Sequence, residues 1–302
     1  MPTDNSVPIA VAIADLHLSL LQPACRADDD WMAVQAHYLA EVKEIANGLP
    51  ILCAGDIFDR WNAPPELINF ALEYLPNGML CVPGQHDLPN HQTDQMHRCG
   101  YGVLKKVGKI RDISGQTTGN MGGWIVYGFA WGQEIQRPAT HMSNLKCIAL
   151  IHRYCWTINY SYPGAPEDSH LNTYAKPLRG YDVAVFGDNH KGFTAQLKFA
   201  GTNVLNCGGL IRRKSDEIGY NPSIGIIYSD GTVKRRWLDT SMDNFHDVPE
   251  DKKEIPLNMR EFIEGLEGLG EHGLNFREAV ENFIRDEEME PEVKEIIVKA
   301  LA

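Results

Sequence analysis

Side chains that can bind a metal ion or carry a proton stand just after several short apolar runs of the sequence. Carboxylate and amide oxygens and imidazole nitrogens are ligands for Mn²⁺, Mg²⁺, Fe²⁺ and Zn²⁺. Carboxylates that converge at neutral pH repel one another unless cations offset their charge, so a cluster of them predicts a site for divalent metal ions. The segments are Ala14-Asp15-Leu16-His17, Gly55-Asp56-Ile57-Phe58-Asp59, Gly84-Gln85-His86-Asp87, the lone His152 and Gly187-Asp188-Asn189-His190.

Each of these segments is weak evidence by itself. An Asp-x-His pair such as Asp15 and His17 more often caps a turn at the end of a strand, and a single histidine such as His152 can be an ordinary core residue. Their common position is stronger evidence, because ligands in α/β folds collect at the carboxyl ends of strands. We therefore expect the segments to meet at one edge of the fold.

The elements between the segments predict an α/β fold. In the first half, strand-like apolar runs at 9–14, 51–54 and 79–82 alternate with helical patterns at 31–45 and 64–75. Beyond residue 107 helical patterns become rare. A second sheet packed on the first, with helices outside, is the simplest architecture that buries the remaining apolar runs. These further predicted strands lie at 109–113, 124–129, 147–151, 183–186, 203–206, 224–228 and 232–238.

The end of the chain differs in character from the rest. We expect a main domain at 1–240 with a β-rich end, a polar linker at 241–256 and an acidic helical segment at 257–302. Residues 239–302 include 18 acidic and 7 basic side chains, which account for most of the net charge of −12. The near-neutral remainder does not exclude a nucleic-acid substrate. The helical segment is either a layer packed on the domain or a module that binds a partner.

Cysteine usage and hydropathy narrow the class of protein further. The seven cysteines form no CxxC pair, and several lie in apolar runs, so we expect small buried side chains rather than disulfides or a thiolate metal site. No apolar run approaches the roughly 20 residues of a membrane span, and the first residues lack the features of a signal peptide. We expect a cytoplasmic protein without a membrane partner.

The order and spacing of the segments resemble the calcineurin-like metallophosphoesterase superfamily, whose pattern is DxH, GDxxD, GNHD, a lone His and GHxH. The resemblance implies a four-layer α/β/β/α metallophosphoesterase sandwich, here with a small C-terminal helical appendage. It also implies two divalent metal ions that activate a water for hydrolysis of a phosphate ester.

The same resemblance assigns roles to individual residues. It implies Asp15, His17 and His190 as ligands of the first metal, with Asp56 bridging both metals. It implies that Gln85, His152 and Asp188 face the second metal. His86 would act as general acid at the leaving group, and Asp87 would orient it.

Two positions on the side of the second metal depart from the family pattern. Gln85 stands in place of the usual Asn, and Asp188 in place of the first His of GHxH. Both residues still supply an oxygen, and oxygen ligands suit harder cations. We therefore expect Mn²⁺ or Mg²⁺ rather than Zn²⁺ at this second site. For the pair of ions Mn²⁺ is the first expectation, with Mg²⁺, Fe²⁺ and Zn²⁺ as alternatives.

Further similarities, in 150–152, 181–187 and 206–212, are to the nuclease subunit of SbcCD-type and Mre/Rad-type DNA repair and recombination complexes, phage nucleases included. They imply a DNA exonuclease or endonuclease with an ATPase partner at the C-terminal helices, and they allow a homodimer. Two alternatives stay open. One is a small-molecule phosphodiesterase or phosphatase acting on nucleotides or lipid-linked phosphates, and the other is a catalytically weakened binding subunit.

Two groups of residues bear on the substrate. The basic residues at 212–214 and 234–236 form either a phosphate-contacting edge or a solvated turn and strand. Aromatic residues in the loop 153–176 either stack unpaired bases or pack the loop itself. These aromatic residues are Tyr154, Trp156, Tyr160, Tyr162 and Tyr174.

Overall fold

Six strands form the first of two β-sheets in the computed structural model, which describes residues 6–118, 121–138, 145–162 and 164–246. The strand order is β11-β10-β1-β2-β3-β4. Strands β1 to β4 are parallel, and β10 and β11 add antiparallel pairs at one edge. The bounds are Pro8–Ile13 (β1), Ile51–Cys53 (β2), Met79–Cys81 (β3), Ile110–Asp112 (β4), Ser223–Tyr228 (β10) and Val233–Trp237 (β11).

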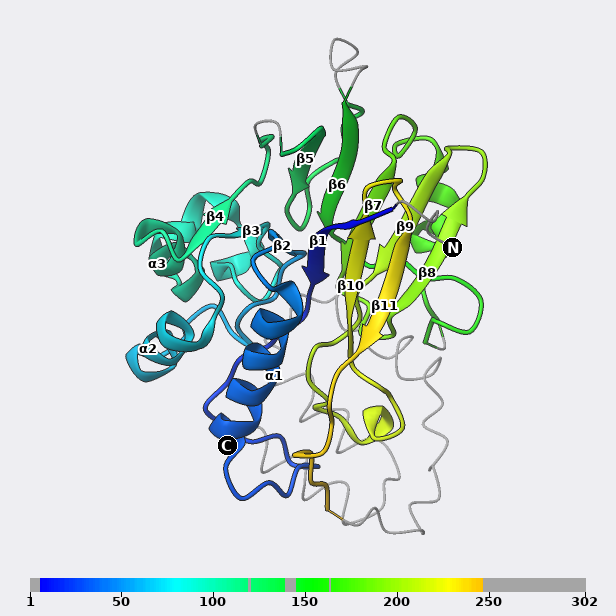
Figure 1. Ribbon diagram of the computed structural model, residues 1–302. Coiled ribbons are helices and arrows are strands. Elements are labelled where there is room, and N and C mark those ends of the chain that lie inside the picture. The colour runs from blue at the N-terminus through cyan, green and yellow to red at the C-terminus, as the bar shows by residue number, and fades with distance from the viewer. Residues whose placement is uncertain (1–5, 119–120, 139–144, 163, 247–302) are drawn as a thin grey trace, which may run out of the picture. The chain divides into compact units, whose positions relative to one another are not determined.

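The second sheet has five strands in the order β5-β6-β7-β9-β8. Its first four strands in this order are parallel, and β8 pairs antiparallel with β9 at the edge. Figure 1 shows the two sheets next to each other, with β1 beside the second sheet. The bounds are Trp124–Phe129 (β5), Lys146–His152 (β6), Val183–Gly187 (β7), Phe193–Leu197 (β8) and Thr202–Asn206 (β9).

Within the described residues, three α-helices lie beside the first sheet (Figure 1). They are α1 (Trp31–Ala46), α2 (Pro65–Tyr74) and α3 (Gly100–Lys106). Asp30 caps α1 through a hydrogen bond that its side chain accepts from the backbone N–H of Ala33, and Asn47 ends the helix in the left-handed conformation. Short 3₁₀ turns complete the described elements at Pro89–His91 (η1), Thr93–Arg98 (η2), Glu167–Ser169 (η4), Leu171–Ala175 (η5) and Ser215–Glu217 (η6).

Strand side chains alternate between the two faces of a sheet, so both faces of each sheet can be buried. In the described residues they are buried in three apolar layers. In β1, Val11 and Ile13 belong to the cluster that includes Tyr38 and Val42 of α1. Ala10 and Ala12 point the other way, into a cluster between the sheets that includes Ile148 of β6. The outer face of the second sheet is covered by residues from the segment 171–181, in a third cluster that includes Leu171, Tyr174, Leu178 and Tyr181.

The architecture confirms the predicted α/β class and the second sheet. The four layers are α-helices, two sheets, and an outer layer that the 3₁₀ turn η5 and neighbouring loop residues supply. The acidic helical segment predicted at 257–302 lies outside the described residues, as does most of the predicted linker. Among the described residues, no helix has the length and apolar character needed to cross a membrane.

One strand and one α-helix of the described residues were not predicted from the sequence patterns. Strand β8 has only its first and last residues buried, so it lacks the apolar run by which the other strands were identified. Helix α3 has glycine at its first and third positions, which lowers its intrinsic helix propensity. Burial of Tyr101 and Leu104 in the apolar cluster between the first sheet and the helices offsets this low propensity. Tertiary packing therefore stabilises the helix.

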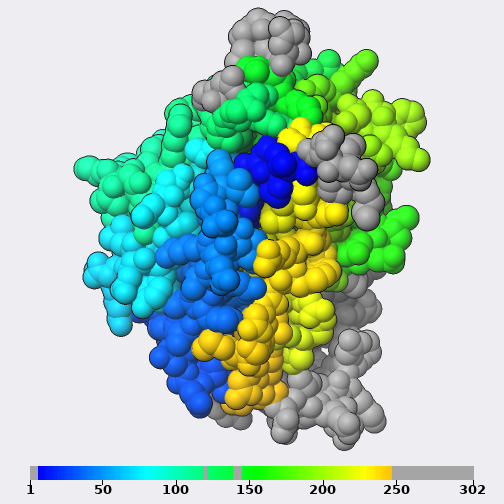
Figure 2. All heavy atoms as spheres, in the orientation of Figure 1, coloured from blue at the N-terminus to red at the C-terminus, as the bar shows by residue number. Residues whose placement is uncertain are grey.

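The last described residues return to α1 and to residues 26–28, which precede this helix (Figure 2). Tyr38 of α1 donates a hydrogen bond of 2.8 Å to Asp243. Asp243 also accepts hydrogen bonds from the guanidinium groups of Arg26 and Arg212, at 2.8 and 2.7 Å. Arg26 and Asp243 have fully buried side chains, and paired charges of this kind are costly to separate. The network fixes residue 212, which begins a turn that borders the candidate site.

Candidate metal centre

The predicted segments meet where the carboxyl ends of five parallel strands come together. Strands β1, β2 and β3 lead into Asp15, Asp56 and Gln85, and strands β6 and β7 of the other sheet lead into His152 and Asp188. The two sheets are joined at this point by the carboxylate of Asp15, which accepts hydrogen bonds of 3.0 and 3.1 Å from the backbone N–H of Asp188. The edge predicted from the sequence therefore exists, and it is shared by both sheets.

The backbone at four of these residues has an uncommon conformation. Asp15, His17, Asp56 and Asp188 have positive φ angles of 52, 45, 53 and 81°. Non-glycine residues in this region cost on the order of 1–3 kcal/mol each and persist where the surrounding structure holds them. Hydrogen bonds from the backbone N–H of Asp15 to Gly55 and of His17 to Asp56, at 3.0 and 2.9 Å, provide that support. With this backbone conformation, the side chains point into one cluster.

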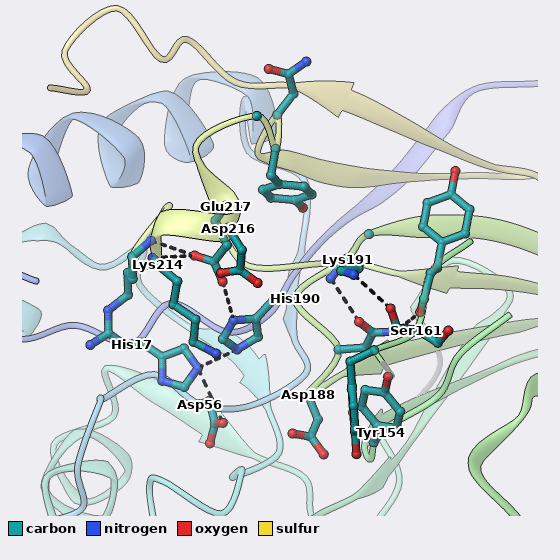
Figure 3. Close-up of a pocket in the computed structure, with 18 of the residues that line it drawn as sticks. His17, Asp56, Tyr154, Ser161, Asp188, His190, Lys191, Lys214, Asp216 and Glu217 are labelled. Atoms are coloured by element: carbon teal, nitrogen blue, oxygen red, sulfur yellow. Dashed lines mark hydrogen bonds and ion pairs between the residues drawn. The ribbon is translucent and has the colours of Figure 1, made fainter. Parts of the chain in front are cut away.

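The first group of ligand atoms comes from Asp15, His17 and His190, and these atoms lie within 4.8 Å of one another. Nε2 of His17 is 3.1 Å from Nε2 of His190. The other ring nitrogen of His190, Nδ1, is 3.1 Å from a carboxylate oxygen of Glu217. Figure 3 shows His190 between His17 and Glu217, with Asp56 beyond His17. These three residues are the ones that the family resemblance implies for the first metal.

The second group comes from Asp15, Asp56 and His152, whose ligand atoms also lie within 4.8 Å. Nε2 of His152 is 2.7 Å from Oε1 of Gln85 and 3.4 Å from Oδ2 of Asp56. The amide nitrogen of Gln85 donates a hydrogen bond of 2.8 Å to Asp188. Both residues that depart from the family pattern therefore lie in this cluster, in contact with each other.

The donor set fits divalent cations. Nδ1 of His152 faces the carbonyl oxygen of Ala54, so Nδ1 carries a proton and Nε2 is the ring atom that faces the cluster. Nε2 lies beside the oxygen atoms of Gln85 and Asp56, and a bound cation would replace the proton that it otherwise carries. Oδ2 of Asp56 is buried and has no hydrogen-bond partner in the part of the chain that the structure describes. A buried carboxylate oxygen and an imidazole nitrogen that converge in this way form an arrangement that a cation satisfies.

The pKa values of the buried carboxylates and histidine also indicate a site for a cation. Burial raises the pKa of Asp15 to about 7, because a carboxylate without a counter-ion is poorly solvated there. Burial lowers the pKa of His17 well below its ordinary value, which leaves the ring neutral and able to bind a metal. For Asp56, burial acts to raise the pKa, but the positive charge of the nearby His152 outweighs it and the pKa is lowered. The cluster thus favours an ionised Asp56 only when positive charge is close.

The structure gives His86 and Asp87 different surroundings. His86 is exposed, and its Nδ1 lies 2.9 Å from the carbonyl oxygen of Asp59. Asp87 is fully buried, and its carboxylate accepts hydrogen bonds from the backbone N–H groups of Ile57, Phe58 and Gly84. The expectation that Asp87 orients the His86 ring is therefore corrected. Asp87 binds the loops after β2 and β3 together, and Asp59 holds the histidine.

A pocket of about 930 Å³ opens from the metal-ligand cluster. Of the predicted basic residues, Arg213, Lys214 and Arg235 line this pocket. Arg212 lies elsewhere and binds Asp243. Of the predicted aromatic residues, Tyr154, Tyr160 and Tyr162 line the pocket. Tyr174 packs in the core and Trp156 bonds the carbonyl oxygen of Pro166, so these two follow the packing alternative.

Sequence reasoning missed Glu217 and the supporting role of Asp59. Glu217 lies 27 residues after its partner His190 in a polar turn, and nothing in the local sequence distinguishes it from a solvated glutamate. Asp59 was part of the second segment, yet only the fold shows that its side chain pairs with Arg213 at 2.7 Å.

A family model described as calcineurin-like phosphoesterase matches residues 10–192, a range that includes every predicted metal-ligand segment. A search of curated proteins found no match.

Solved structures that resemble the chain are distant in sequence. The protein TT1561 of Thermus thermophilus has 11% identity and a TM-score of 0.45, with 76% of this chain and 99% of that chain covered. A structure described as a novel archaeal phosphodiesterase has 12% identity and a TM-score of 0.39, with 76% and 99% covered. A 5'-nucleotidase precursor from Thermus thermophilus has 14% identity and a TM-score of 0.43, with 77% and 54% covered.

The family match spans more than half of the chain, and it coincides with the clustered carboxylate and imidazole ligands. The chain therefore belongs to the calcineurin-like phosphoesterases, a family of divalent-metal-dependent hydrolases that act on phosphate esters.

Proposed function

We propose that the chain is a DNA nuclease that cleaves phosphodiester bonds with two divalent ions, Mn²⁺ first among them. The single observation that supports this substrate most is the pocket beside the metal-ligand cluster, which is large, open and lined by both aromatic and basic residues. Tyr160 and Tyr162 are 37% and 48% exposed there. Exposed rings stack on unpaired bases and basic side chains contact phosphates, which together suit a nucleic-acid strand.

The residues of the cluster have distinct roles in this proposal. Asp15, His17 and His190 would hold one ion, Gln85, His152 and Asp188 would hold the other, and Asp56 would be shared by both. Divalent ions at these residues would lower the pKa of water and offset the charge that builds up on the transferred phosphoryl group.

His86 donates a proton to the departing oxygen in this proposal. Its ring is exposed at the pocket, and its Nδ1 is held by the carbonyl oxygen of Asp59 at 2.9 Å, so Nε2 is free to face a substrate. The backbone N–H of His86 also donates a hydrogen bond of 3.0 Å to Asp56. That bond ties the position of the proposed general acid to the proposed bridging carboxylate.

The aromatic wall provides a test of the substrate. Replacing both Tyr160 and Tyr162 by alanine is expected to lower kcat/KM for single-stranded DNA about tenfold or more, since stacking contributes about 1–3 kcal/mol per base. Hydrolysis of bis(4-nitrophenyl) phosphate, which has no bases to stack, is expected to change less than about twofold. Phe199→Ala is the matched control, because Phe199 is an aromatic residue 98% exposed and does not line the pocket.

Equal losses on DNA and on the generic diester would contradict a base-stacking role. A small-molecule phosphodiesterase would hydrolyse nucleotide esters and leave DNA intact. The ATPase partner that the nuclease resemblance implies and the homodimer that it allows remain part of the proposal, and the predicted helices that would bind the partner lie outside the described residues.

A further inference from the structure

Glu217 contacts both the metal-ligand cluster and the turn that follows β9. One carboxylate oxygen, Oε1, lies 3.1 Å from Nδ1 of His190. The other, Oε2, accepts hydrogen bonds from the backbone N–H groups of Arg213 and Lys214, at 2.7 and 3.1 Å. Figure 3 shows Glu217 between His190 and Lys214. A single carboxylate therefore joins a metal-ligand histidine to the backbone of a basic turn.

We propose that Glu217 is a positioning residue of the metal centre, which fixes the tautomer and orientation of His190 and holds the basic turn beside it. The proposal rests on the assignment of His190 as a metal ligand. It adds a residue that lies outside the part of the chain matched by the family model, which ends at residue 192.

The chemistry of the contact selects one tautomer. Two backbone N–H groups donate to Oε2 of Glu217, at 2.7 and 3.1 Å, and hydrogen bonds of this kind hold a glutamate side chain in its carboxylate form at neutral pH. An ionised carboxylate only accepts hydrogen bonds, so Nδ1 of His190 must carry a proton. The neutral ring then has its lone pair on Nε2, the atom that lies 3.1 Å from Nε2 of His17 inside the cluster.

The turn that carries Glu217 is held from several sides. The guanidinium of Arg212 donates to the carbonyl oxygen of Ile218 at 2.7 Å, which closes the turn, and to Asp243 at 2.7 Å. Arg26 donates to the carbonyl oxygen of Arg212 at 3.1 Å. The side chain of Glu217 is only 12% exposed. Its carboxylate thus has a fixed position before any metal binds, which is what a residue that orients a ligand requires.

The same contacts extend to the proposed general acid. The side chain of Arg213, whose backbone Glu217 holds, donates a hydrogen bond of 2.7 Å to the carboxylate of Asp59. The carbonyl oxygen of Asp59 in turn lies 2.9 Å from Nδ1 of His86. Glu217 is therefore connected to His190 directly and to His86 through two residues, and we expect the metal ligand to respond more strongly than the acid.

The isosteric variant Glu217→Gln tests the tautomer. Glutamine has one acceptor oxygen. If that oxygen accepts from the backbone of the turn, the amide NH₂ faces His190 and requires a lone pair on Nδ1, which places the proton on Nε2. If the amide is turned the other way, its NH₂ meets two backbone N–H groups. Either arrangement costs a contact that the carboxylate makes without conflict.

Two measurements on the whole protein check the proposal. Calorimetric titration with Mn²⁺ is expected to show one ion bound about 10–100-fold more weakly in Glu217→Gln. Nitrogen-15 NMR of the metal-free protein is expected to show the ring proton of His190 on Nδ1 in the wild type and displaced from it in the variant. Asp216→Asn is the matched control, because it removes the same charge from the neighbouring, exposed residue, and its Mn²⁺ affinity should stay within about twofold.

The outcomes separate this proposal from the assignment of the centre itself. Unchanged Mn²⁺ affinity together with an unchanged His190 proton in Glu217→Gln would overturn the role of Glu217 and leave the metal centre intact. If Asp15→Asn binds Mn²⁺ as tightly as the wild type does, the assignment of the metal centre is wrong, and this proposal is wrong with it. If Glu217→Gln fails to fold, Glu217→Asp keeps the charge but shortens the reach, and the same loss of affinity is expected.

Discussion

Oδ2 of Asp56 lies 3.4 Å from Nε2 of His152 and has no hydrogen-bond partner within the described ranges. Its other oxygen is occupied, because Oδ1 accepts a hydrogen bond of 3.0 Å from the backbone of His86. A buried carboxylate with one oxygen held and the other free at the centre of a ligand cluster has the form expected of a bridge between two cations.

Asp56→Asn is expected to abolish most of the activity, by about 100-fold or more, because the amide cannot supply the anionic oxygen that two cations share. The variant keeps the size of the side chain, and its fold should survive. Activity with saturating Mn²⁺ and the number of bound ions by calorimetry would check this. Near-normal turnover with two bound ions would show that Asp56 is no bridge.

Asp188→His restores the family residue at the second site and should shift the metal preference towards Zn²⁺, since imidazole is a softer ligand than carboxylate. It also removes the acceptor of the 2.8 Å hydrogen bond from Gln85. The measurement is relative activity across Mn²⁺, Mg²⁺ and Zn²⁺ for the variant and the wild type. An unchanged order of metals would refute the idea that Asp188 sets the preference.

His86→Ala should retain metal binding and react about 10²–10⁴-fold more slowly with substrates that have a poor leaving group, because a general acid contributes about this much. The loss should be much smaller with a nitrophenyl ester, whose leaving group departs without a proton. Single-turnover rates on both kinds of ester compare the two effects. Equal losses on both would argue that His86 acts in some other way.

Asp15→Asn should stabilise the metal-free protein at pH 8 while removing its response to metal. Burial raises the pKa of Asp15 to about 7, above the value near 3.9 of an unfolded chain. The stability from this group is therefore present below about pH 4 and is lost as the pH rises through 7. Without metal, the variant should melt on the order of 5 °C above the wild type at pH 8 and close to it at pH 4.

Excess Mn²⁺ should reverse this order at pH 8 by stabilising the wild type. Calorimetric melting curves at the two pH values, with chelator and with Mn²⁺, give all the comparisons. A metal-free variant less stable than the wild type at pH 8 would mean that Asp15 is satisfied without a cation.

The sequence predicted most of the strands, and the convergence of the candidate ligands at one edge, because both depend on local patterns. An apolar run followed by a turn and a polar side chain predicts a strand that ends at the candidate site, and β1, β2 and β7 all follow this pattern. Strand β8 and helix α3 lack such patterns, since packing in the folded protein decides them. Asp87 was misassigned because adjacency to His86 along the chain suggested contact, whereas three backbone N–H groups take up its carboxylate. Glu217 is brought to His190 only by the tertiary fold.

The most direct test of the account is metal-dependent cleavage of DNA by the purified protein. Wild type and Asp56→Asn would be freed of metal and then incubated with Mn²⁺ on end-labelled single- and double-stranded DNA and on bis(4-nitrophenyl) phosphate. The wild type is expected to cleave DNA and the generic diester, and chelation of the metal or the Asp56→Asn substitution is expected to abolish both activities. Hydrolysis of the diester with DNA left intact would contradict the proposed nuclease, and no hydrolysis of any ester with Mn²⁺ would contradict the metal centre itself.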